Sequence, residues 1–235
     1  MRLQELSWTE VRDEEFEIAI LPVGSTEQHG PHNPVGVDSI VACRFAEGAA
    51  ERTDAVLLPS IDVGIAEHHR EFEGTLYVTH DTLRDYVQET LKSLSRHGIE
   101  RVVVVNGHGG NSAALEEACA RLTRDGDLYA VCWEWFNTRG ESVSHGGKYE
   151  TAIMQYLEPE LVSESGPSDT DSWGKSIKSA KVAYDTHDFT DTGFAGDVSE
   201  ATPELGEKMF EESLDDLVEL VEWITDTDLP SSFNE

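Results

Sequence analysis

Two short apolar runs, each followed at once by a loop rich in glycine and histidine, constrain the fold of this chain most. The first run, at residues 18–23, opens into Gly-Ser-Thr and then Glu-Gln-His-Gly-Pro-His at 27–32. The second, at 102–105, consists only of valine and leads into Asn-Gly-His-Gly-Gly-Asn at 106–111. Unbroken runs of this kind are typical of strands buried on both faces of a parallel sheet.

Strand and helix patterns alternate along the chain. The sequence predicts strands near 17–23, 55–59, 101–105 and 127–133, and helices near 39–52, 83–97, 112–124, 148–157 and 203–225. Strands separated by helices of this length favour a mainly parallel sheet covered on both faces. We therefore expect an α/β protein with a three-layer α/β/α fold and a single domain over residues 1–235. We interpret 180–183 as an edge strand and 163–172 as an exposed loop.

Both histidine loops follow the carboxyl end of a predicted strand, where ligand sites form in open α/β sheets. Glu27, His29 and Asp38 follow the first strand, and His108 follows the second. Charged groups are costly to bury unless something pairs with them. Because carboxylate oxygen and neutral imidazole nitrogen are ordinary ligands for zinc, iron and manganese, the sequence predicts a divalent-metal site here.

A third cluster, His-Gly-Gly-Lys-Tyr-Glu-Thr at 145–151, begins the predicted helix at 148–157. His29, His32, His108 and His145 all lie in the three clusters, although the chain has only nine histidines. His80, His97 and His187 lie in polar or charged parts of the sequence, and we interpret them as surface residues. The glycine-rich loop at 106–111 matches neither the dinucleotide fingerprint nor the P-loop, which argues against a nucleotide cofactor.

The three clusters resemble the signatures of the creatininase family, over about residues 1–225 and in the family's order. Residues 67–75 resemble a further family segment, in which Glu73 replaces a proline. The resemblance implies an amidohydrolase with two divalent metal ions (zinc, iron or manganese) that assembles into hexamers. It implies that Glu27 and His108 hold one metal, that His29 holds the other, and that Asp38 bridges both.

Two positions depart from the family pattern. Creatininase itself has a glutamate ligand for the second metal where this chain has Gly110. We expect Glu150, or a water molecule, to fill that position. The creatinine hydrolases of the family carry a tryptophan where this chain has Glu141, which argues against creatinine as the substrate.

The expected chemistry is hydrolysis by a metal-bound hydroxide, since a divalent ion lowers the pKa of bound water toward about 7. The leaving nitrogen must be protonated, and His145 is the candidate general acid and base, with Glu150 as a second catalytic candidate. A purely structural hydrogen-bonding role at a helix start is the alternative for His145. The residues expected to contact substrate are His32, His68, Asn106 and Lys148.

The composition points to an unusual surface. Aspartate and glutamate total 47 against 17 lysine and arginine, for a formal net charge of −30. Such a surface repels nucleic acid and anionic membranes, so we expect neither as a partner, and it suggests a halophilic cytoplasm. No apolar run is long enough to span a membrane, and the first residues lack a signal-peptide core, so we expect a cytoplasmic protein. Cys43, Cys119 and Cys132 are interpreted as small core residues.

We therefore expect a metal-dependent amidohydrolase that cleaves a non-peptide C–N bond in a small molecule. A halophilic cytoplasm makes an archaeal source plausible. Within the family, an archaeal source favours release of formate from a formamidopyrimidine ribonucleotide, on the route to riboflavin and the deazaflavin coenzyme. The phosphate of that substrate would need a cation, for which Arg70, Arg139 and Lys148 are candidates. The alternatives are a creatinine-type cyclic amide hydrolase and, in another class, a non-catalytic metal-binding subunit.

Overall fold

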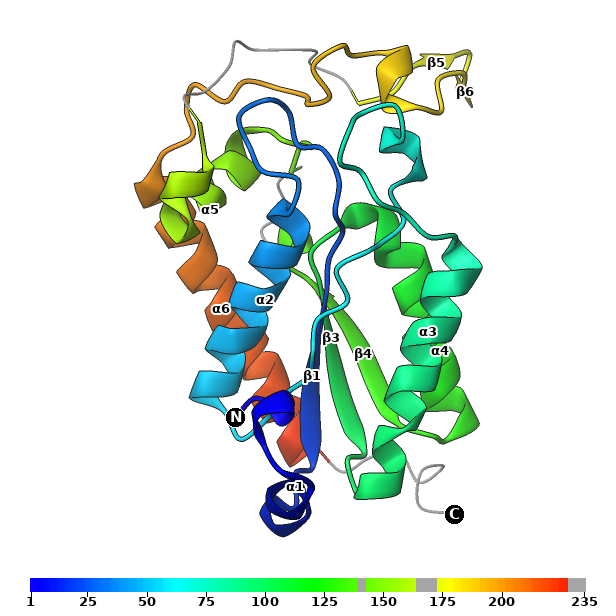
Figure 1. Cartoon of the computed structure of the whole chain (residues 1–235), viewed down its shortest axis with the longest axis vertical. Helices are drawn as coiled ribbons and strands as arrows, with labels where there is room; N and C mark the ends of the chain where they lie inside the picture. Colours follow the sequence, from blue (N-terminus) through cyan, green and yellow to red (C-terminus); the bar gives the residue numbers. More distant parts are fainter. Residues whose placement is uncertain (139–142, 164–172, 228–235) are drawn as a thin grey trace.

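Four parallel strands in the order β2–β1–β3–β4 form the central sheet of the chain (Figure 1). The structure is a computed structural model that describes residues 1–138, 143–163 and 173–227. The strands are β1 Ile18–Val23, β2 Val56–Leu57, β3 Arg101–Asn106, β4 Tyr129–Glu134, β5 Ser176–Ile177 and β6 Ala180–Lys181. The α-helices are α1 Trp8–Glu14, α2 Val37–Arg52, α3 His80–Lys92, α4 Ser112–Asp125, α5 Lys148–Leu157 and α6 Pro203–Asp226. Single turns of 3₁₀ helix span Leu3–Glu5, Glu67–His69, Leu94–His97, Gly109–Asn111, Trp135–Asn137, Pro159–Leu161 and Thr186–Asp188.

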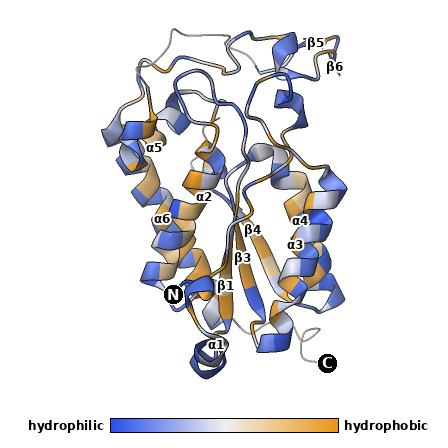
Figure 2. Ribbon diagram, in the orientation of Figure 1, coloured by the Kyte–Doolittle hydropathy of each residue, from blue (hydrophilic) through white to orange (hydrophobic). Residues whose placement is uncertain are grey.

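Helices cover both faces of the sheet, which confirms the predicted three-layer α/β/α fold (Figure 1). Side chains alternate across a strand, so Ile18 and Ile20 of β1 face the apolar core formed with α2, α5 and α6. Ala19 and Leu21 face the opposite core, formed with α3 and α4. Figure 2 shows the apolar residues along the strands and on the inward sides of the helices. The unbroken apolar runs therefore arise because each strand is buried on both faces.

The strand register brings two loops to one edge of the sheet. Val23 at the end of β1 pairs with Asn106 at the end of β3, so the loops that follow are neighbours. The start of α2 packs tightly between them. A Cβ atom on Gly24 would lie 2.4 Å from Ser39 Cα, and one on Gly107 would lie 2.1 Å from the carbonyl oxygen of Asp38. Glycine is thus required at both strand ends for the first turn of α2 to reach the sheet edge.

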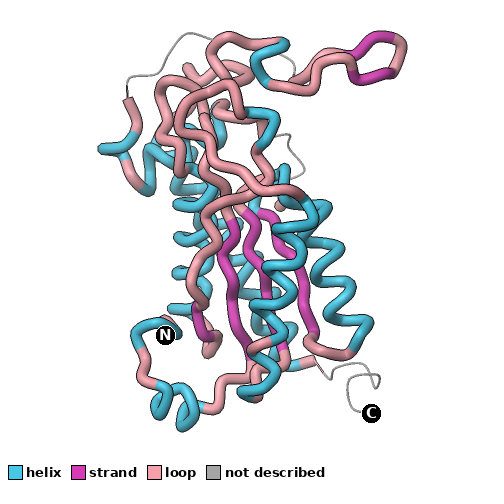
Figure 3. The backbone as a smooth tube through the Cα atoms, turned by 45° about the vertical axis from the view of Figure 1, so that its right-hand side comes forward, coloured by secondary structure: helices cyan, strands magenta, loops and turns pink. Residues whose placement is uncertain are grey.

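Several predicted boundaries differ from the structure. Helix α2 begins at Val37, two residues earlier than predicted, which places Asp38 in its first turn. The helix predicted at 83–97 is α3 followed by a separate 3₁₀ turn, and α1 was not predicted. The run at 180–183 was predicted to be an edge strand; residues 180–181 form strand β6, which pairs with β5 in an antiparallel hairpin outside the central sheet. Figure 3 shows this hairpin projecting from the body. Of the loop predicted at 163–172, residues 164–172 lie outside the described residues.

Other sequence predictions concern single residues and the surface. His80, His97 and His187 are exposed, as predicted. All three cysteines are free; Cys119 is buried, whereas Cys43 and Cys132 are partly exposed. Within the described part of the chain, no helix combines the length and apolar character needed to cross a membrane.

Candidate metal centre

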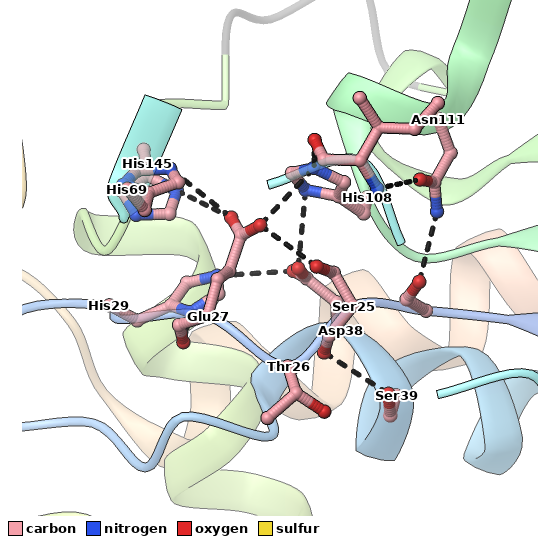
Figure 4. Close-up of polar contacts among 12 residues, drawn as sticks. Ser25, Thr26, Glu27, His29, Asp38, Ser39, His69, His108, Asn111 and His145 are labelled. Atoms are coloured by element: carbon pink, nitrogen blue, oxygen red, sulfur yellow. Dashed lines mark hydrogen bonds and ion pairs between the residues drawn. The ribbon is translucent and has the colours of Figure 1, made fainter. Parts of the chain in front are cut away.

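Five ionisable side chains from four separate segments meet at the carboxyl edge of the sheet, and Figure 4 shows four of them, Glu27, His29, Asp38 and His108. The loop after β1 supplies Glu27 and His29, and the loop after β3 supplies His108. The first turn of α2 supplies Asp38, and the first turn of α5 supplies Glu150. All five are buried. These are the five metal ligands expected from the sequence, and folding brings them together.

The first group of possible ligands consists of Glu27, Asp38 and His108, whose ligand atoms lie within 4.8 Å of one another. His108 Nε2 is 3.2 Å from Glu27 Oε2, and His108 Nδ1 is 3.2 Å from Asp38 Oδ2. Two carboxylates and one imidazole form a mixed oxygen and nitrogen set that zinc, manganese and iron all accept.

The second group consists of His29, Asp38 and Glu150, again within 4.8 Å of one another. His29 Nε2 lies 3.1 Å from Asp38 Oδ1 and 3.7 Å from Glu150 Oε2. Asp38 thus belongs to both groups, with one oxygen toward His108 and the other toward His29. This is the arrangement expected of a carboxylate that bridges two ions.

Three imidazoles of the site each lie against a backbone carbonyl oxygen. His29 Nδ1 is 3.1 Å from the carbonyl of Glu27, and His108 Nε2 is 3.0 Å from that of Ile65. His145 Nε2 is 2.7 Å from the carbonyl of Gln28. Because a carbonyl oxygen can only accept, the nitrogen beside it carries the hydrogen, and in the neutral ring the other nitrogen directs a lone pair into the cluster.

Two carboxylate oxygens of the cluster indicate that the residues fit metal ions. Glu27 Oε1 and Asp38 Oδ2 are buried and have no hydrogen-bond partner among the described residues. A buried carboxylate oxygen without a partner is destabilising, whereas a divalent cation would satisfy it. Both residues belong to the first ligand group, so these oxygens fit a divalent cation held there.

Burial and mutual charge shift the pKa values of these groups in the protein without metal. Burial raises the pKa of Glu27 to about 8 and that of Glu150 to about 7. Burial alone would lower the pKa of both ligand histidines. The neighbouring carboxylates outweigh it and raise the pKa to about 10 for His29 and about 9 for His108. Burial would raise the pKa of Asp38, but the two imidazolium groups hold it well below its usual range.

Metal binding should therefore release protons. A histidine whose pKa is raised stays protonated at neutral pH, and it must lose that proton before it can bind a metal ion. We expect binding of two Zn²⁺ or Mn²⁺ ions at pH 7 to release about three protons, two from the histidines and the rest from Glu27 and Glu150, and the apparent affinity to rise between about pH 6 and pH 10. Calorimetry in buffers of different ionisation enthalpy measures this number. An affinity that falls over the same range would contradict the assignment of His29 and His108 as ligands.

Local geometry explains why position 110 is a glycine, and α5 offers a carboxylate, that of Glu150, in its place. A Cβ atom on Gly110 would be 2.3 Å from His108 Nε2 and 2.5 Å from the carbonyl oxygen of Ile65, so this loop conformation admits only glycine. Glu150 reaches the cluster from α5, and its Oε2 accepts a hydrogen bond of 2.5 Å from the backbone N–H of Gly146. The carboxylate that position 110 cannot supply is thus offered by another segment.

His145 lies between the cluster and the cavity above it. Its Nδ1 is 3.6 Å from Glu27 Oε1, and its ring centroid is 4.4 Å from that of His29. Burial, assisted by nearby imidazoles, lowers the pKa of His145 well below its usual range, so the ring is neutral. A neutral ring with Nδ1 unprotonated can accept a proton there. His145 also forms a third ligand group with Glu27 and His29, so the same nitrogen could contact a metal ion.

His69 is a site residue that the sequence analysis missed. Its Nδ1 lies 2.8 Å from the side-chain amide nitrogen of Gln28, which can only donate, so the hydrogen of the neutral ring is on Nε2. That nitrogen is buried 3.4 Å from Glu27 Oε1, and neither atom has a hydrogen-bond partner among the described residues. Of the adjacent pair, His68 was the residue predicted from the sequence to contact substrate. On the 3₁₀ turn Glu67–His69 the two rings point differently, and His69 is the fully buried one.

The four residues expected to contact substrate occupy different places. His68 lines the cavity. His32 is buried, and its Nε2 contacts the carbonyl of Gly146 at 2.9 Å. Asn106 donates to Glu134 at 2.9 Å, and Lys148 donates to Glu200 at 2.7 Å. His32, Asn106 and Lys148 are therefore not part of the described cavity wall, and the first two hold loops around the site.

A cavity of about 430 Å³ opens directly above the cluster. This volume is within the usual range for small-molecule sites, about 300–1,000 Å³. His108, His145 and Glu150 form its polar side, and Phe136 and Trp173 contribute apolar surface. Among the described residues that line it, there is no lysine or arginine.

Comparison with known proteins gives a match over most of the chain. The sequence profile of the creatininase family, described as creatinine amidohydrolase, matches residues 4–221. A mycofactocin precursor peptide peptidase from Mycobacterium ulcerans is 30% identical over 213 residues, 85% of this chain and 82% of the relative. Creatinine amidohydrolase from Pseudomonas putida is 30% identical over 171 residues, 62% of this chain and 66% of the relative.

The deformylases that the sequence analysis favoured match over a shorter stretch. The enzyme from Methanobrevibacter ruminantium that acts on 2-amino-5-formylamino-6-ribosylaminopyrimidin-4(3H)-one 5'-monophosphate is 30% identical over 142 residues, 60% of this chain and 58% of the relative. Among solved structures, a Bacteroides fragilis protein provisionally named a creatinine amidohydrolase has a TM-score of 0.81 at 25% identity, covering 98% of both chains. A manganese form of creatininase has a TM-score of 0.75 at 23% identity, covering 94% of this chain and 97% of the other, which shows the shared fold.

Proposed function

The chain belongs to the creatininase family, and from that premise we propose that it is a two-metal hydrolase that cleaves an amide C–N bond in an uncharged substrate. One observation carries the proposal. Two ligand groups share Asp38 at the base of a cavity that has no described cationic residue in its wall. The five ligands are all present, which disfavours the non-catalytic metal-binding subunit considered as an alternative.

The protein's own groups supply position and proton transfer. Glu27, Asp38 and His108 would hold one ion, and His29, Asp38 and Glu150 the other. Bound there, the ions would activate water and polarise the amide carbonyl. When the Nε2 hydrogen of His145 lies on the carbonyl of Gln28, 2.7 Å away, His145 can accept a proton at Nδ1 and give it to the leaving nitrogen. The side-chain amide of Gln28, 3.0 Å from the same Nε2, then donates its two hydrogens to Gly193 and His69.

The cavity wall favours a substrate without a phosphate. Of the cations expected to receive a phosphate, Lys148 is paired with Glu200, and Arg70 is paired with Asp185 at 2.7 Å. Arg139 lies outside the described residues. With three carboxylates in the cluster and Trp173 in the wall, the site suits a neutral amide beside an apolar group. Among the relatives compared, the peptidase matches over a larger share of both chains, so a short peptide joins the first substrates to test.

The test is a panel of three substrates with protein loaded with zinc or manganese in concentrated potassium chloride. The panel consists of creatinine, a short peptide that has an aromatic side chain and both termini blocked, and the formamidopyrimidine nucleotide. We expect one of the two uncharged amides to be cleaved with kcat/KM at least about tenfold above that of the nucleotide, because leaving a buried polar or charged group unpaired lowers kcat/KM by tenfold or more. Glu27→Ala and chelation are the controls, and both should abolish turnover.

Each other outcome has a definite meaning. Preferred formate release would show that the nucleotide is the substrate and that the uncharged class is wrong, while the two-metal hydrolase would stand. If two metal ions bind tightly and no amide is cleaved, the non-catalytic metal-binding subunit becomes the better description.

A further inference from the structure

The buried side-chain amide of Gln28 lies between two histidines of the site and a segment far along the chain. Its nitrogen is 2.6 Å from the carbonyl oxygen of Gly193, 2.8 Å from His69 Nδ1 and 3.0 Å from His145 Nε2. Its oxygen accepts a hydrogen bond of 2.9 Å from the backbone N–H of Gly30. Because an amide nitrogen carries two hydrogens, three neighbours compete for two donors.

Two backbone groups fix the direction in which this amide points. The N–H of Gly30 can only donate, so it faces the amide oxygen, and the carbonyl of Gly193 can only accept, so it faces the amide nitrogen. If the amide were turned over, two donors would meet at one contact and two acceptors at the other. One amide hydrogen is therefore committed to Gly193, and one remains for a histidine.

The remaining hydrogen can serve only one of the two rings. Both rings are neutral, because burial lowers the pKa of His69 to about 2 and that of His145 well below its usual range. If the hydrogen is donated to His69 Nδ1, His145 Nε2 keeps its own hydrogen and donates it to the carbonyl of Gln28 at 2.7 Å. If it is donated to His145 Nε2 instead, a lone pair of that ring faces the same carbonyl oxygen. The first pattern satisfies both short contacts, so we assign it.

The segment 185–196 supplies a second donor to the same nitrogen of His69. The hydroxyl of Thr186 is buried and lies 3.0 Å from His69 Nδ1. Gly193 belongs to this segment, and two of its other residues, Ala195 and Gly196, line the cavity. Because a hydroxyl and an amide can both donate here, His69 Nδ1 is held as an acceptor.

The two rings consequently present different atoms to Glu27. His145 Nδ1, 3.6 Å from Glu27 Oε1, has a lone pair, whereas His69 Nε2, 3.4 Å from the same oxygen, carries a hydrogen. Figure 4 shows the rings side by side, and their centroids are 4.4 Å apart. A ring nitrogen that carries a hydrogen cannot bind a metal ion. His69 therefore stays outside the ligand set, although it lies as near to Glu27 as His145 does.

We propose that Gln28 is a positioning residue that fixes the ring hydrogens of His69 and His145. It thereby leaves Nδ1 of His145 free to act as a base and keeps His69 as a hydrogen-bond donor. Gln28 is not among the described residues that line the cavity, so it acts through the two rings. The role in proton transfer rests on the proposed function, whereas the placement of the hydrogens does not.

The first test locates the ring hydrogens by NMR of protein labelled with ¹⁵N at histidine, without added metal, at pH 8. Ring nitrogens with and without a hydrogen resonate at well-separated frequencies, and His69→Phe and His145→Phe assign the signals. We expect the hydrogen on Nε2 in both rings of the wild type. Gln28→Glu replaces the donor with a carboxylate, which can only accept, and should move the hydrogen of His69 to Nδ1. Gln4→Glu, the same change at an exposed position, should leave both rings as they are.

A second pair of variants reaches His69 without disturbing the amide. Thr186→Asp sets a carboxylate against His69 Nδ1 and should also move the hydrogen to that nitrogen, whereas Thr186→Val cannot accept and should leave it on Nε2. A wild-type His69 with its hydrogen on Nδ1 would overturn the proposal. So would a hydrogen that stays on Nε2 in both Gln28→Glu and Thr186→Asp.

Steady-state kinetics of metal-loaded protein then tests the role in proton transfer. We expect Gln28→Glu to lower kcat at least about tenfold, the usual effect of losing a residue that orients a site histidine, with KM little changed. Gln4→Glu should keep both constants. Unchanged kcat in a variant whose ring hydrogen has moved would show that the placement has no catalytic role. If the wild type cleaves no amide, the proposed function fails, and the NMR result still decides where the hydrogens lie.

Discussion

Asp38→Asn is expected to remove both metal ions and to lower kcat/KM at least about 10³-fold. The metal ions stabilise the transition state by several kcal/mol, and each loss of about 1.4 kcal/mol lowers the rate about tenfold. The reason is the position of Asp38. Its two oxygens lie 3.1 Å from His29 and 3.2 Å from His108, so it serves both ligand groups. An amide keeps the shape of the side chain but cannot bridge two cations with negative oxygens. Metal content measured by mass spectrometry after dialysis checks the result.

Two further variants make this test specific. Glu150→Gln should lose one ion and keep the other, because Glu150 belongs to the second group only. Asp81→Asn, at an exposed position on α3, should keep two ions and full activity. If Asp38→Asn retains two ions, Asp38 is not the shared ligand. If Glu150→Gln retains two ions, a water molecule rather than Glu150 fills the ligand position that the family glutamate occupies and that Gly110 leaves empty.

His145→Ala is expected to lower kcat by about 10²–10⁴-fold while two metal ions stay bound, the range typical of a lost general acid and base. His145 lines the cavity, and its Nδ1 faces the cluster without a proton. Because burial lowers its pKa well below the usual range, the ring should remain neutral through neutral pH and keep its capacity as a base. Steady-state kinetics together with metal analysis of the same samples checks both parts of the expectation.

The metal content decides between the two roles open to His145. Loss of one ion in His145→Ala would assign the residue to the third ligand group, with Glu27 and His29, rather than to proton transfer. Unchanged kcat would leave it a hydrogen-bonding residue, the alternative weighed from the sequence. His80→Ala provides the matched control, since His80 is exposed at the start of α3.

Much of the fold could be predicted because burial leaves a direct trace in the sequence. The valines of β3 are apolar on both faces because helices cover both faces of the sheet. The position of the metal ligands follows from the same pattern, since ligands gather where parallel strands end. Boundaries were less predictable. Asp38 enters α2 because Gly24 and Gly107 let that helix approach the strand ends, a contact between segments distant in sequence.

The roles of individual site residues depended more on the tertiary structure. Glu150 was predicted as a metal ligand only because Gly110, at the position of the family glutamate, has no side chain that can bind a metal ion. Its contact with His29 exists because α5 packs beside α2, and no local pattern encodes that packing. His69 was missed, since two adjacent histidines look equivalent until a 3₁₀ turn buries one of them. Lys148 was expected near a phosphate, but its charge is paired with Glu200 on a distant segment.

The sequence by itself determined the family, the alternation of strands and helices, and the chemical types gathered at the strand ends, because each is recorded in local residue order. Only the tertiary structure decided that Asp38 lies in two ligand groups, that Glu150 lies beside His29, that the cavity wall has no described cation, and that the β5–β6 hairpin stands apart from the central sheet. These features depend on distances between remote segments. The packing of helices on the sheet sets such distances, and residue order alone does not specify them.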